Sequence, residues 1–356
     1  LRIYLRQNIM TNSSKYIQTV LGKIKPEDLG ITTTHEHLFI DFKAMLIEPK
    51  ESTELFKAYE SIRLDNLGWI RRNWTSNLDN LLILDEEITI TEASKYKRAG
   101  GGTIVDATSI GIGRDPLALA RVSRATNINV VMGASYYVDK VHPENMDEIK
   151  ESTITQMIID DITHGVEDTN IKAGIIGEIG CSWPLTKNET KVLRASAAAQ
   201  AETGAAISIH LGRNEKSPKE IIEILKESGA DLTRTIMGHL DRTVSSYDVL
   251  IEIAENGCYL EYDLFGQETS FYPLSNFDML SDGQRIDYLI YLISKGYEKQ
   301  IVIAQDICTK HRLQKYGGHG FSHIIENVIP HMIEKGMSRK QIDNIIINNP
   351  ANILAI

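Results

Sequence analysis

The 356-residue chain has few cysteines and no spacing that would make them a structural framework. Cys181, Cys258 and Cys308 are odd in number and form no C-x-x-C pair, so a disulfide scaffold is excluded and a reducing, cytoplasmic location is expected. No apolar run reaches the ~20 residues that a membrane-spanning helix needs. The opening residues, LRIYLRQNIM, have neither a long apolar core nor a cleavage site, so we expect no signal peptide and no membrane partner.

Positive charge is also scarce. Lysine and arginine number 38 against 48 aspartates and glutamates, and the net charge is −10. Nucleic-acid binding requires a basic stripe, so this function class is excluded. An anionic small-molecule substrate would therefore need a local positive site. The glycines form no G-x-G-x-x-G after the first predicted strand, which leaves a dinucleotide fold without support.

Linkers, internal repeats and low-complexity tracts are absent as well. The sequence therefore predicts a single domain over residues 11–356. The chain does not begin with methionine, and Met10 is a candidate native start. Residues 1–10 are accordingly expected to be an upstream extension or residues introduced by cloning.

Eight short runs of β-branched and apolar residues alternate with helical patterns. The predicted strands are residues 32–41, 101–109, 129–138, 172–180, 205–212, 234–241, 257–265 and 300–308. Helical patterns lie between them, for example at residues 187–204, 217–230, 245–257 and 283–296. Eight strand-then-helix units in about 300 residues predict an α/β fold, a (β/α)8 TIM barrel, with a doubly wound open sheet as the alternative.

Two local features add to this prediction. Ser217 and Pro218 predict a helix start, with the serine as N-cap and the proline at the first helical position. Residues 42–85 form a long, partly helical insertion after the first strand. In a barrel, we expect such an insertion to lie over the catalytic mouth.

The stretch TTTHEHLFID places His35 and His37 on one face of the first predicted strand, because side chains at i and i+2 share a face. An H-x-H pair alone is a weak sign of a metal site, since two polar residues near a strand end give the same pattern. Four more metal-capable side chains fall at the carboxyl ends of the fourth, fifth, sixth and eighth predicted strands, and in a barrel these ends converge. The predicted metal ligands are His35, His37, Glu178, His210, His239 and Asp306.

Six ligands exceed what one zinc-type ion takes from a protein and suit two divalent ions that share a carboxylate. Zn²⁺ best fits this histidine-rich set, although manganese, cobalt or iron would also bind. Two such ions lower the pKa of a bridging water and supply a hydroxide nucleophile, while one ion polarises the scissile carbonyl or phosphoryl oxygen. Asp306 would bind one ion, accept a proton and pass it to the leaving group, which makes it the predicted catalytic residue.

A non-catalytic barrel that keeps its metals for stability is the alternative from a different functional class. The aspartate at the end of the eighth strand argues against it, because a structural site needs neither an open position nor a base.

These residues resemble the ligand pattern of the amidohydrolase superfamily and, within it, the phosphotriesterase family, over nearly the whole chain. The stretches GIIGEIGCSWPLT, HLDRT, GCYLEYDLFG and KYGGHGFSHI resemble an animal branch of that family. Founding members bridge their metals with a carboxylated lysine, whereas this chain has Glu178 and is similar to the branch in which glutamate bridges. One departure is Gln305, where the animal proteins have histidine; next to Asp306 on the strand, it should point away from the site.

The resemblance implies a metal-dependent hydrolase of N-acyltaurines, chiefly N-acetyltaurine, which would release taurine and acetate. An esterase, lactonase or phosphotriesterase on the same metals is the alternative within the class. Barrels of this superfamily are often dimers, so a homodimer is expected by analogy.

Residues just beyond the ligand-bearing strands are candidates for binding the substrate. Arg213 and Arg242 follow the fifth and sixth strands, and a guanidinium binds oxyanions through a planar fork; the alternative is pairing with a surface carboxylate. Tyr137 ends the third strand and would either reach the mouth or pack in the core. Trp183 is a candidate for the pocket wall. Asp241 would either orient a ligand histidine or cap a loop.

Overall fold

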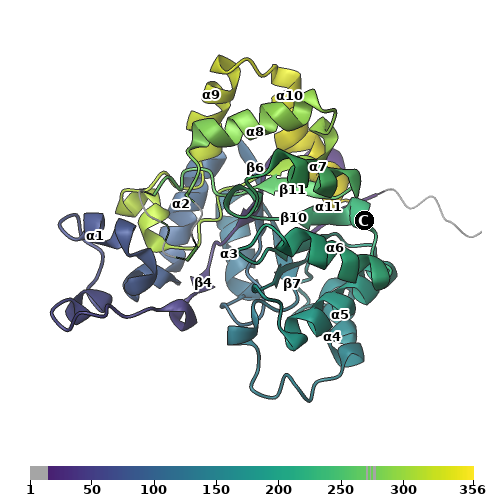
Figure 1. Cartoon of the computed structure of the whole chain (residues 1–356), viewed down its shortest axis with the longest axis horizontal. Helices are drawn as coiled ribbons and strands as arrows, with labels where there is room; N and C mark the ends of the chain where they lie inside the picture. The colour runs from purple at the N-terminus through teal and green to yellow at the C-terminus, as the bar shows by residue number, and fades with distance from the viewer. Residues whose placement is uncertain (1–14, 270–271, 273, 276–277) are drawn as a thin grey trace, which may run out of the picture.

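Eight strands run parallel in one sheet, in the spatial order β3-β6-β7-β8-β9-β10-β11-β12 (Figure 1). They are β3 (Ile31–Glu36), β6 (Gly101–Asp106), β7 (Asn129–Ala134), β8 (Ile175–Gly180), β9 (Ile207–His210), β10 (Thr235–Met237), β11 (Tyr259–Tyr262) and β12 (Ile301–Ile303). The N–H of Asp306 donates to the carbonyl of His35 at 3.0 Å, and the Thr34 hydroxyl donates to the carbonyl of Ile303 at 3.2 Å. These bonds join β3 and β12, the first and last strands of the sheet, and close it. The predicted (β/α)8 barrel is therefore confirmed, and the alternative prediction of an open sheet is wrong.

The structure is a computed structural model that describes residues 15–356 apart from 270–271, 273 and 276–277. The predicted extension, residues 1–10, lies outside this part of the chain. Two antiparallel pairs accompany the barrel: β1 (Ile17–Thr19) with β2 (Gly22–Ile24), and β4 (Ile40–Asp41) with β5 (Leu82–Ile83). Among the described helices, none is both long and apolar enough to cross a bilayer.

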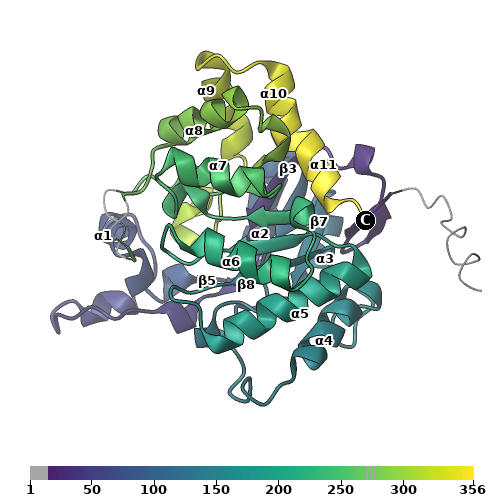
Figure 2. The same ribbon diagram turned by 45° about the vertical axis from the view of Figure 1, so that its right-hand side comes forward.

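Helices surround the strands, and Figure 2 shows α4 to α8 following one another around one side of the barrel. The helices are α1 (Leu67–Arg72), α2 (Glu86–Arg98), α3 (Pro116–Thr126), α4 (Glu151–Thr163), α5 (Lys187–Thr203), α6 (Ser217–Glu227), α7 (Tyr247–Glu255), α8 (Asp282–Ser294), α9 (Ile329–Glu334), α10 (Arg339–Asp343) and α11 (Asn349–Leu354). The predicted N-cap role of Ser217 is wrong: Lys216 occupies the cap position, and the Ser217 hydroxyl oxygen instead accepts the Gly212 N–H at 3.1 Å. The four predicted helices named above are all present.

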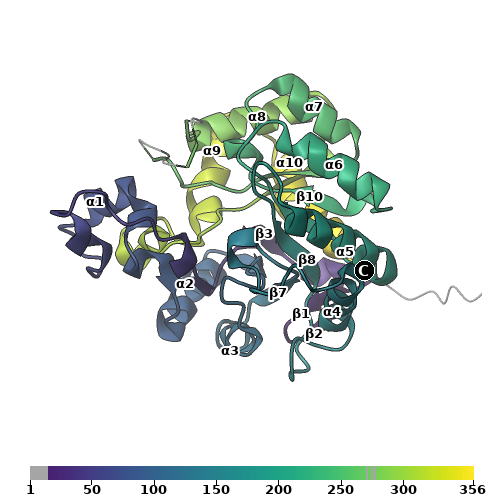
Figure 3. The ribbon, with the colours of Figure 1, turned by 60° about the horizontal axis from the view of Figure 1, so that its bottom comes forward.

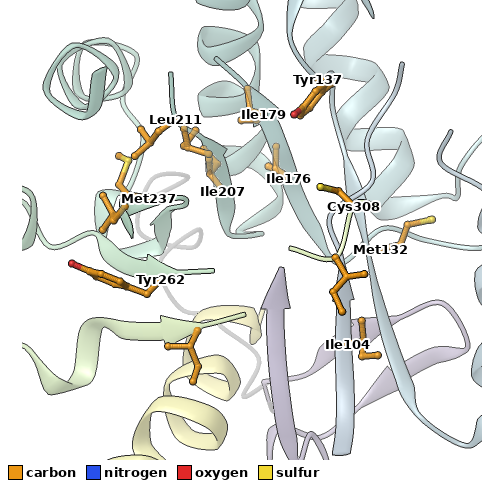
Figure 4. Packing of buried hydrophobic residues seen from close by; sticks show 14 of the residues in the cluster. Ile104, Met132, Tyr137, Ile176, Ile179, Ile207, Leu211, Met237, Tyr262 and Cys308 are labelled. Carbon is orange, nitrogen blue, oxygen red and sulfur yellow. The ribbon is translucent and has the colours of Figure 1, made fainter. Parts of the chain in front are cut away.

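Side chains alternate along the strands between two buried layers. The layer that packs against the outer helices appears in Figure 4 and includes Ile104, Met132, Ile176, Ile207, Met237 and Tyr262. The alternate positions form a second layer with β1 and α11, namely Val105, Val131, Ile175, Ala206, Ile236 and Val302. The second layer is apolar, and the buried histidines and carboxylates lie at the carboxyl ends of the strands.

The insertion over residues 42–85 carries α1. Figure 3 shows α1 at the left beside the segment that follows β12, and Arg71 Nη2 there donates to the carbonyl of Gly317 at 2.6 Å. Phe42, the first residue of the insertion, and Trp74, in its second half, line the cavity at the carboxyl end of the barrel. The predicted place of the insertion over the mouth is confirmed.

Close approach of β7 and β8 explains why position 133 is glycine. A Cβ atom there would lie 2.0 Å from the carbonyl oxygen of Gly177. We expect Gly133→Ala to lower the free energy of unfolding by roughly 1–3 kcal/mol, because the strands would have to separate. Urea denaturation measures this change. Gly68→Ala in α1 is the control, since its Cβ would meet no atom within 4 Å; equal stability of the two variants would contradict the argument.

Candidate metal centre

The predicted ligands converge on the carboxylate of Glu178, which points from β8 into the carboxyl end of the barrel. Its Oε2 lies 3.2 Å from His35 Nε2, 2.9 Å from His210 Nδ1 and 3.5 Å from His239 Nε2. Its Oε1 lies 3.5 Å from His37 Nε2. One buried carboxylate therefore touches four imidazoles brought together from three further strands.

Asp306 completes the group from the opposite side, with its Oδ1 at 3.2 Å from His37 Nε2. Asp306 and His239 lie just beyond β12 and β10, and both have positive φ, 48° and 56°. This region is sparsely populated by residues other than glycine. Hydrogen bonds hold both turns: the Asp306 N–H donates to the His35 carbonyl, and the His239 N–H donates to Asp263 Oδ2 at 2.8 Å.

The separations between these atoms fit a metal site. Ligand atoms at ~2.1 Å from a tetrahedral ion lie ~3.4 Å from one another. Four of the five pairs above lie at 3.2–3.5 Å, and the fifth, between Glu178 and His210, lies at 2.9 Å. His35 Nε2 is buried and has no hydrogen-bond partner in the described chain. Three groups that share His35 have ligand atoms close enough to hold an ion among the described residues. Two consist of predicted ligands, namely His35, Glu178 and His239, and His35, His37 and Asp306; the third is His35, Glu261 and Asp263.

The carboxylates of Asp263 and Glu261, which were not predicted from the sequence, hold the imidazoles of His239 and His35 in place. Asp263 Oδ1 lies 2.8 Å from His239 Nδ1, and Glu261 Oε2 lies 3.4 Å from His35 Nδ1. Because the second nitrogen of each ring is engaged in this way, Nε2 is turned toward the centre. The signal was present: Glu261 on β11 and Asp263 just beyond it are two residues apart, the same spacing as His35 on β3 and His37 just beyond it.

The electrostatic environment keeps the central carboxylates anionic. Burial alone would raise the pKa of Glu178, but His35 and His210 lower this pKa well below its usual range. Burial likewise opposes ionisation of Asp306, whereas the hydrogen bond with His37 and the charge of His239 lower its pKa. Ionised carboxylates are the form that binds metal ions.

Three of the four candidate substrate contacts line the cavity beside Glu178 and Asp306. Arg213 Nε donates to the Tyr272 hydroxyl at 2.8 Å. Arg242 Nη2 lies 3.1 Å from His210 Nε2 and donates to the carbonyl of Leu211 at 3.0 Å. The Tyr137 hydroxyl lies 3.3 Å from His210 Nδ1.

Trp183 is not brought into this group, since the half-buried indole is not among the residues that line the cavity. Trp74 and Tyr272 line it instead and were missed, because both reach the centre from loops far away in the sequence.

The two arginines of the cavity lie near each other. Burial lowers the pKa of the Arg242 guanidinium, and the positive charge of Arg213 lowers it further. Neither guanidinium forms an ion pair with a carboxylate within the described residues. An anion placed between them would relieve this repulsion.

Asp241, Gln305 and the cysteines have other roles. Asp241 Oδ2 accepts hydrogen bonds from the Leu264 N–H at 2.9 Å and from Arg285 Nε at 2.7 Å, so it fixes a loop rather than a ligand histidine. Gln305 points away from the cavity at the centre, and its Oε1 accepts the Ile324 N–H at 3.2 Å.

The three cysteines are free and buried.

Comparisons with known proteins agree with this geometry. The sequence model of the phosphotriesterase family matches residues 15–354 of this chain. The chain is 48% identical over 342 residues to a phosphotriesterase-related protein of Nematostella vectensis, covering 95% of this chain and 98% of that protein. It is 47% identical over 368 residues to the N-acetyltaurine hydrolase of Dictyostelium discoideum, covering 98% and 100%.

A solved structure extends the similarity to the fold. The resiniferatoxin-binding protein from Rhodobacter sphaeroides superposes with a TM-score of 0.92 at 30% identity, over 95% of this chain and 94% of that chain. The family match covers nearly the whole chain, and the histidines and carboxylates lie together at one end of the barrel. This protein therefore belongs to the phosphotriesterase family and is a hydrolase.

Proposed function

We propose that the protein is a metal-dependent amidase that hydrolyses N-acetyltaurine to taurine and acetate. The observation that carries the proposal is the pair of guanidiniums, Arg213 and Arg242, beside the group of histidines and carboxylates. A sulfonate is a permanent anion that fits such a pair. The name of the Dictyostelium relative supports the same substrate.

Two divalent ions, with Zn²⁺ the best match to the donor set, would be held by the residues that converge on Glu178. The proposed ligands are His35, His37, Glu178, His210, His239 and Asp306. When bound, such ions supply an activated water and polarise the acyl oxygen.

The residues of this chain would then bind and orient the substrate and move the proton. Arg213 would bind the sulfonate, and Arg242 would hold the His210 ring while adding positive charge. Asp306 would accept the proton of the attacking water as the C–O bond forms, and return it to the taurine nitrogen as the C–N bond breaks. Tyr137, whose hydroxyl lies 3.3 Å from His210 Nδ1, would donate a hydrogen bond to the acyl oxygen.

The size of the cavity favours a short acyl group. Its free volume is about 30 Å³, far below the ~300–1,000 Å³ of typical ligand pockets. Phe42, Trp74 and Tyr272 form part of its wall, so that even N-acetyltaurine would require some of these side chains to move. A long-chain acyl group would require a larger movement.

The direct test is hydrolysis of N-acetyltaurine by the metal-loaded protein, run beside an aryl ester, a lactone and a phosphotriester. Release of taurine, with slower turnover of the other substrates, would support the proposal. Turnover of only the ester, lactone or phosphotriester would keep the metal chemistry and reject the substrate. No turnover of any substrate, with metals bound, would reject N-acetyltaurine and favour a different acyl-amide substrate.

Arg213→Gln tests the sulfonate contact. We expect the KM for N-acetyltaurine to rise by ~10–100-fold, because a hydrogen bond to a charged group is lost, while kcat changes less. Hydrolysis of the uncharged analogue N-ethylacetamide should be unaffected. Arg194→Gln, at an exposed site on α5, is the matched control. An unchanged KM in Arg213→Gln would reject the assignment.

A further inference from the structure

A second cavity, called here the basic pocket, opens beside the metal centre between the loops that follow β11 and β12. Its volume is about 550 Å³, within the ~300–1,000 Å³ range of small-molecule sites. It shares a single lining residue, Gln267, with the cavity at the metal centre. Helix α1 forms another wall, in the position beside these loops that Figure 3 shows.

Basic side chains dominate the wall of this pocket. They are Arg71, Arg72, His311, Arg312, His319 and His323. Among the described residues that line the pocket, Glu268 is the one carboxylate, and its Oε1 already accepts the N–H of Asp282. In a chain with a net charge of −10, this concentration of basic groups requires an explanation.

Two of the arginines are not neutralised by the protein. Arg71 Nη2 donates to the carbonyl of Gly317 at 2.6 Å. Arg312 donates to the carbonyls of Asp306 and Phe265, at 2.6 and 3.0 Å. No carboxylate of the described chain lies in ion-pair contact with either guanidinium, so their charges remain available to an anion.

Two neighbouring groups support this assignment. Gln305 is buried, lines the pocket, and its Nε2 has no hydrogen-bond partner among the described residues. An unsatisfied buried donor costs ~1–3 kcal/mol, which a bound acceptor would recover. Burial, and then the charges of Arg312 and Arg71, lower the pKa of His311 to about 3, so the guanidiniums and not this imidazole supply the positive charge of the pocket.

We propose that the basic pocket binds a small oxyanion of the phosphate, sulfate or sulfonate class, at a place separate from the reacting substrate. Arg71 and Arg312 supply the charge, and the Gln305 amide donates a further hydrogen bond. TIM barrels frequently bind phosphate at the loops after the seventh and eighth strands, which are the loops of this pocket. The proposal does not depend on the identity of the amide that the enzyme cleaves.

The position of Arg312 connects the pocket with the metal centre. Its Nη1 holds the backbone carbonyl of Asp306, and the flanking Gln305 and Ile307 N–H groups donate to the carboxylate of Glu36 at 2.9 and 3.0 Å. An anion that draws Arg312 toward the pocket would shift the segment that carries Asp306. Occupancy of the pocket should therefore change kcat.

Isothermal titration calorimetry on the metal-loaded protein tests the proposal, with inorganic phosphate, sulfate and taurine as probes at constant ionic strength. The variant Arg71→Gln/Arg72→Gln alters two exposed side chains of α1 that take no part in the proposed chemistry. We expect it to weaken binding of the tightest probe by at least ~10-fold. Arg63→Gln, exposed on the same insertion but not lining the pocket, should bind as the wild type does.

The outcomes separate the basic pocket from the metal centre. Binding that weakens in the double variant and persists in Arg213→Gln supports the proposal, and the tighter of phosphate and taurine identifies a free anion or a reaction product as the ligand. Binding that weakens only in Arg213→Gln would place the anion at the metal centre and overturn it. No binding stronger than a Kd of ~10 mM in the wild type would overturn it as well.

Discussion

Replacing Asp306 with asparagine is expected to lower kcat for N-acetyltaurine hydrolysis by ~10²–10⁴-fold, the usual contribution of a positioned general base. The asparagine amide keeps the size of the side chain but cannot accept the proton of the attacking water. Burial opposes ionisation of Asp306, yet the hydrogen bond with His37 and the charge of His239 lower its pKa, so the side chain is anionic and has a free lone pair to accept a proton. Steady-state kinetics at saturating metal measure the effect.

The control for Asp306→Asn is the metal content of the variant. Asp306 is proposed to hold one ion as well as the proton, so elemental analysis must show that both ions remain. Asp343→Asn, which removes a surface ion pair with Arg339 on α10, should leave kcat unchanged. A kcat within twofold of wild type in Asp306→Asn would assign the base to another residue.

The substitution Glu178→Gln is expected to remove at least one of the two ions and to lower hydrolysis by at least ~10²-fold. Loss of an outer-shell partner costs 10–100-fold in metal affinity or activity, and loss of a ligand shared by two ions should cost more. Every proposed histidine ligand lies within 3.5 Å of this carboxylate, so its negative charge is central to the group. Elemental analysis and taurine release give the two readouts.

Asp263→Asn is the matched comparison for Glu178→Gln. Asp263 contacts His239 from the outer side, so its amide variant should bind metal more weakly but recover both ions at saturating metal. Circular dichroism should show both variants folded. If Glu178→Gln retained two ions and full activity, the proposal that the two ions share the Glu178 carboxylate would be rejected.

The barrel and the convergence of its ligands could be predicted from the sequence because they follow from a repeated pattern. β-Branched runs separated by helices specify the (β/α)8 order, and that order alone brings His35, Glu178, His210 and Asp306 to one end. The arginines after the fifth and sixth strands were found by the same argument, since a residue just past a strand end lies at the mouth.

The residues that were missed are those whose position depends on loops. Trp74 and Tyr272 reach the centre from the insertion and from the loop after β11, and no periodicity specifies the path of such segments. Asp241 and Asp263 could not be ranked from sequence, since both are acidic residues near strand ends. Only the structure shows that Asp263 contacts the imidazole of His239 while Asp241 bonds Arg285.

The hydrogen bond from Asp306 to His35 joins residues that are about 270 positions apart in the chain. During synthesis at ~5–20 residues per second, roughly 15–50 s separate the two residues at the ribosome. Through that interval the paired histidines at the end of β3 exist without the aspartate that faces them. A nascent chain therefore cannot assemble the complete ligand set before Asp306 has been synthesised, and loading of the full metal site is a late event in the synthesis of the chain.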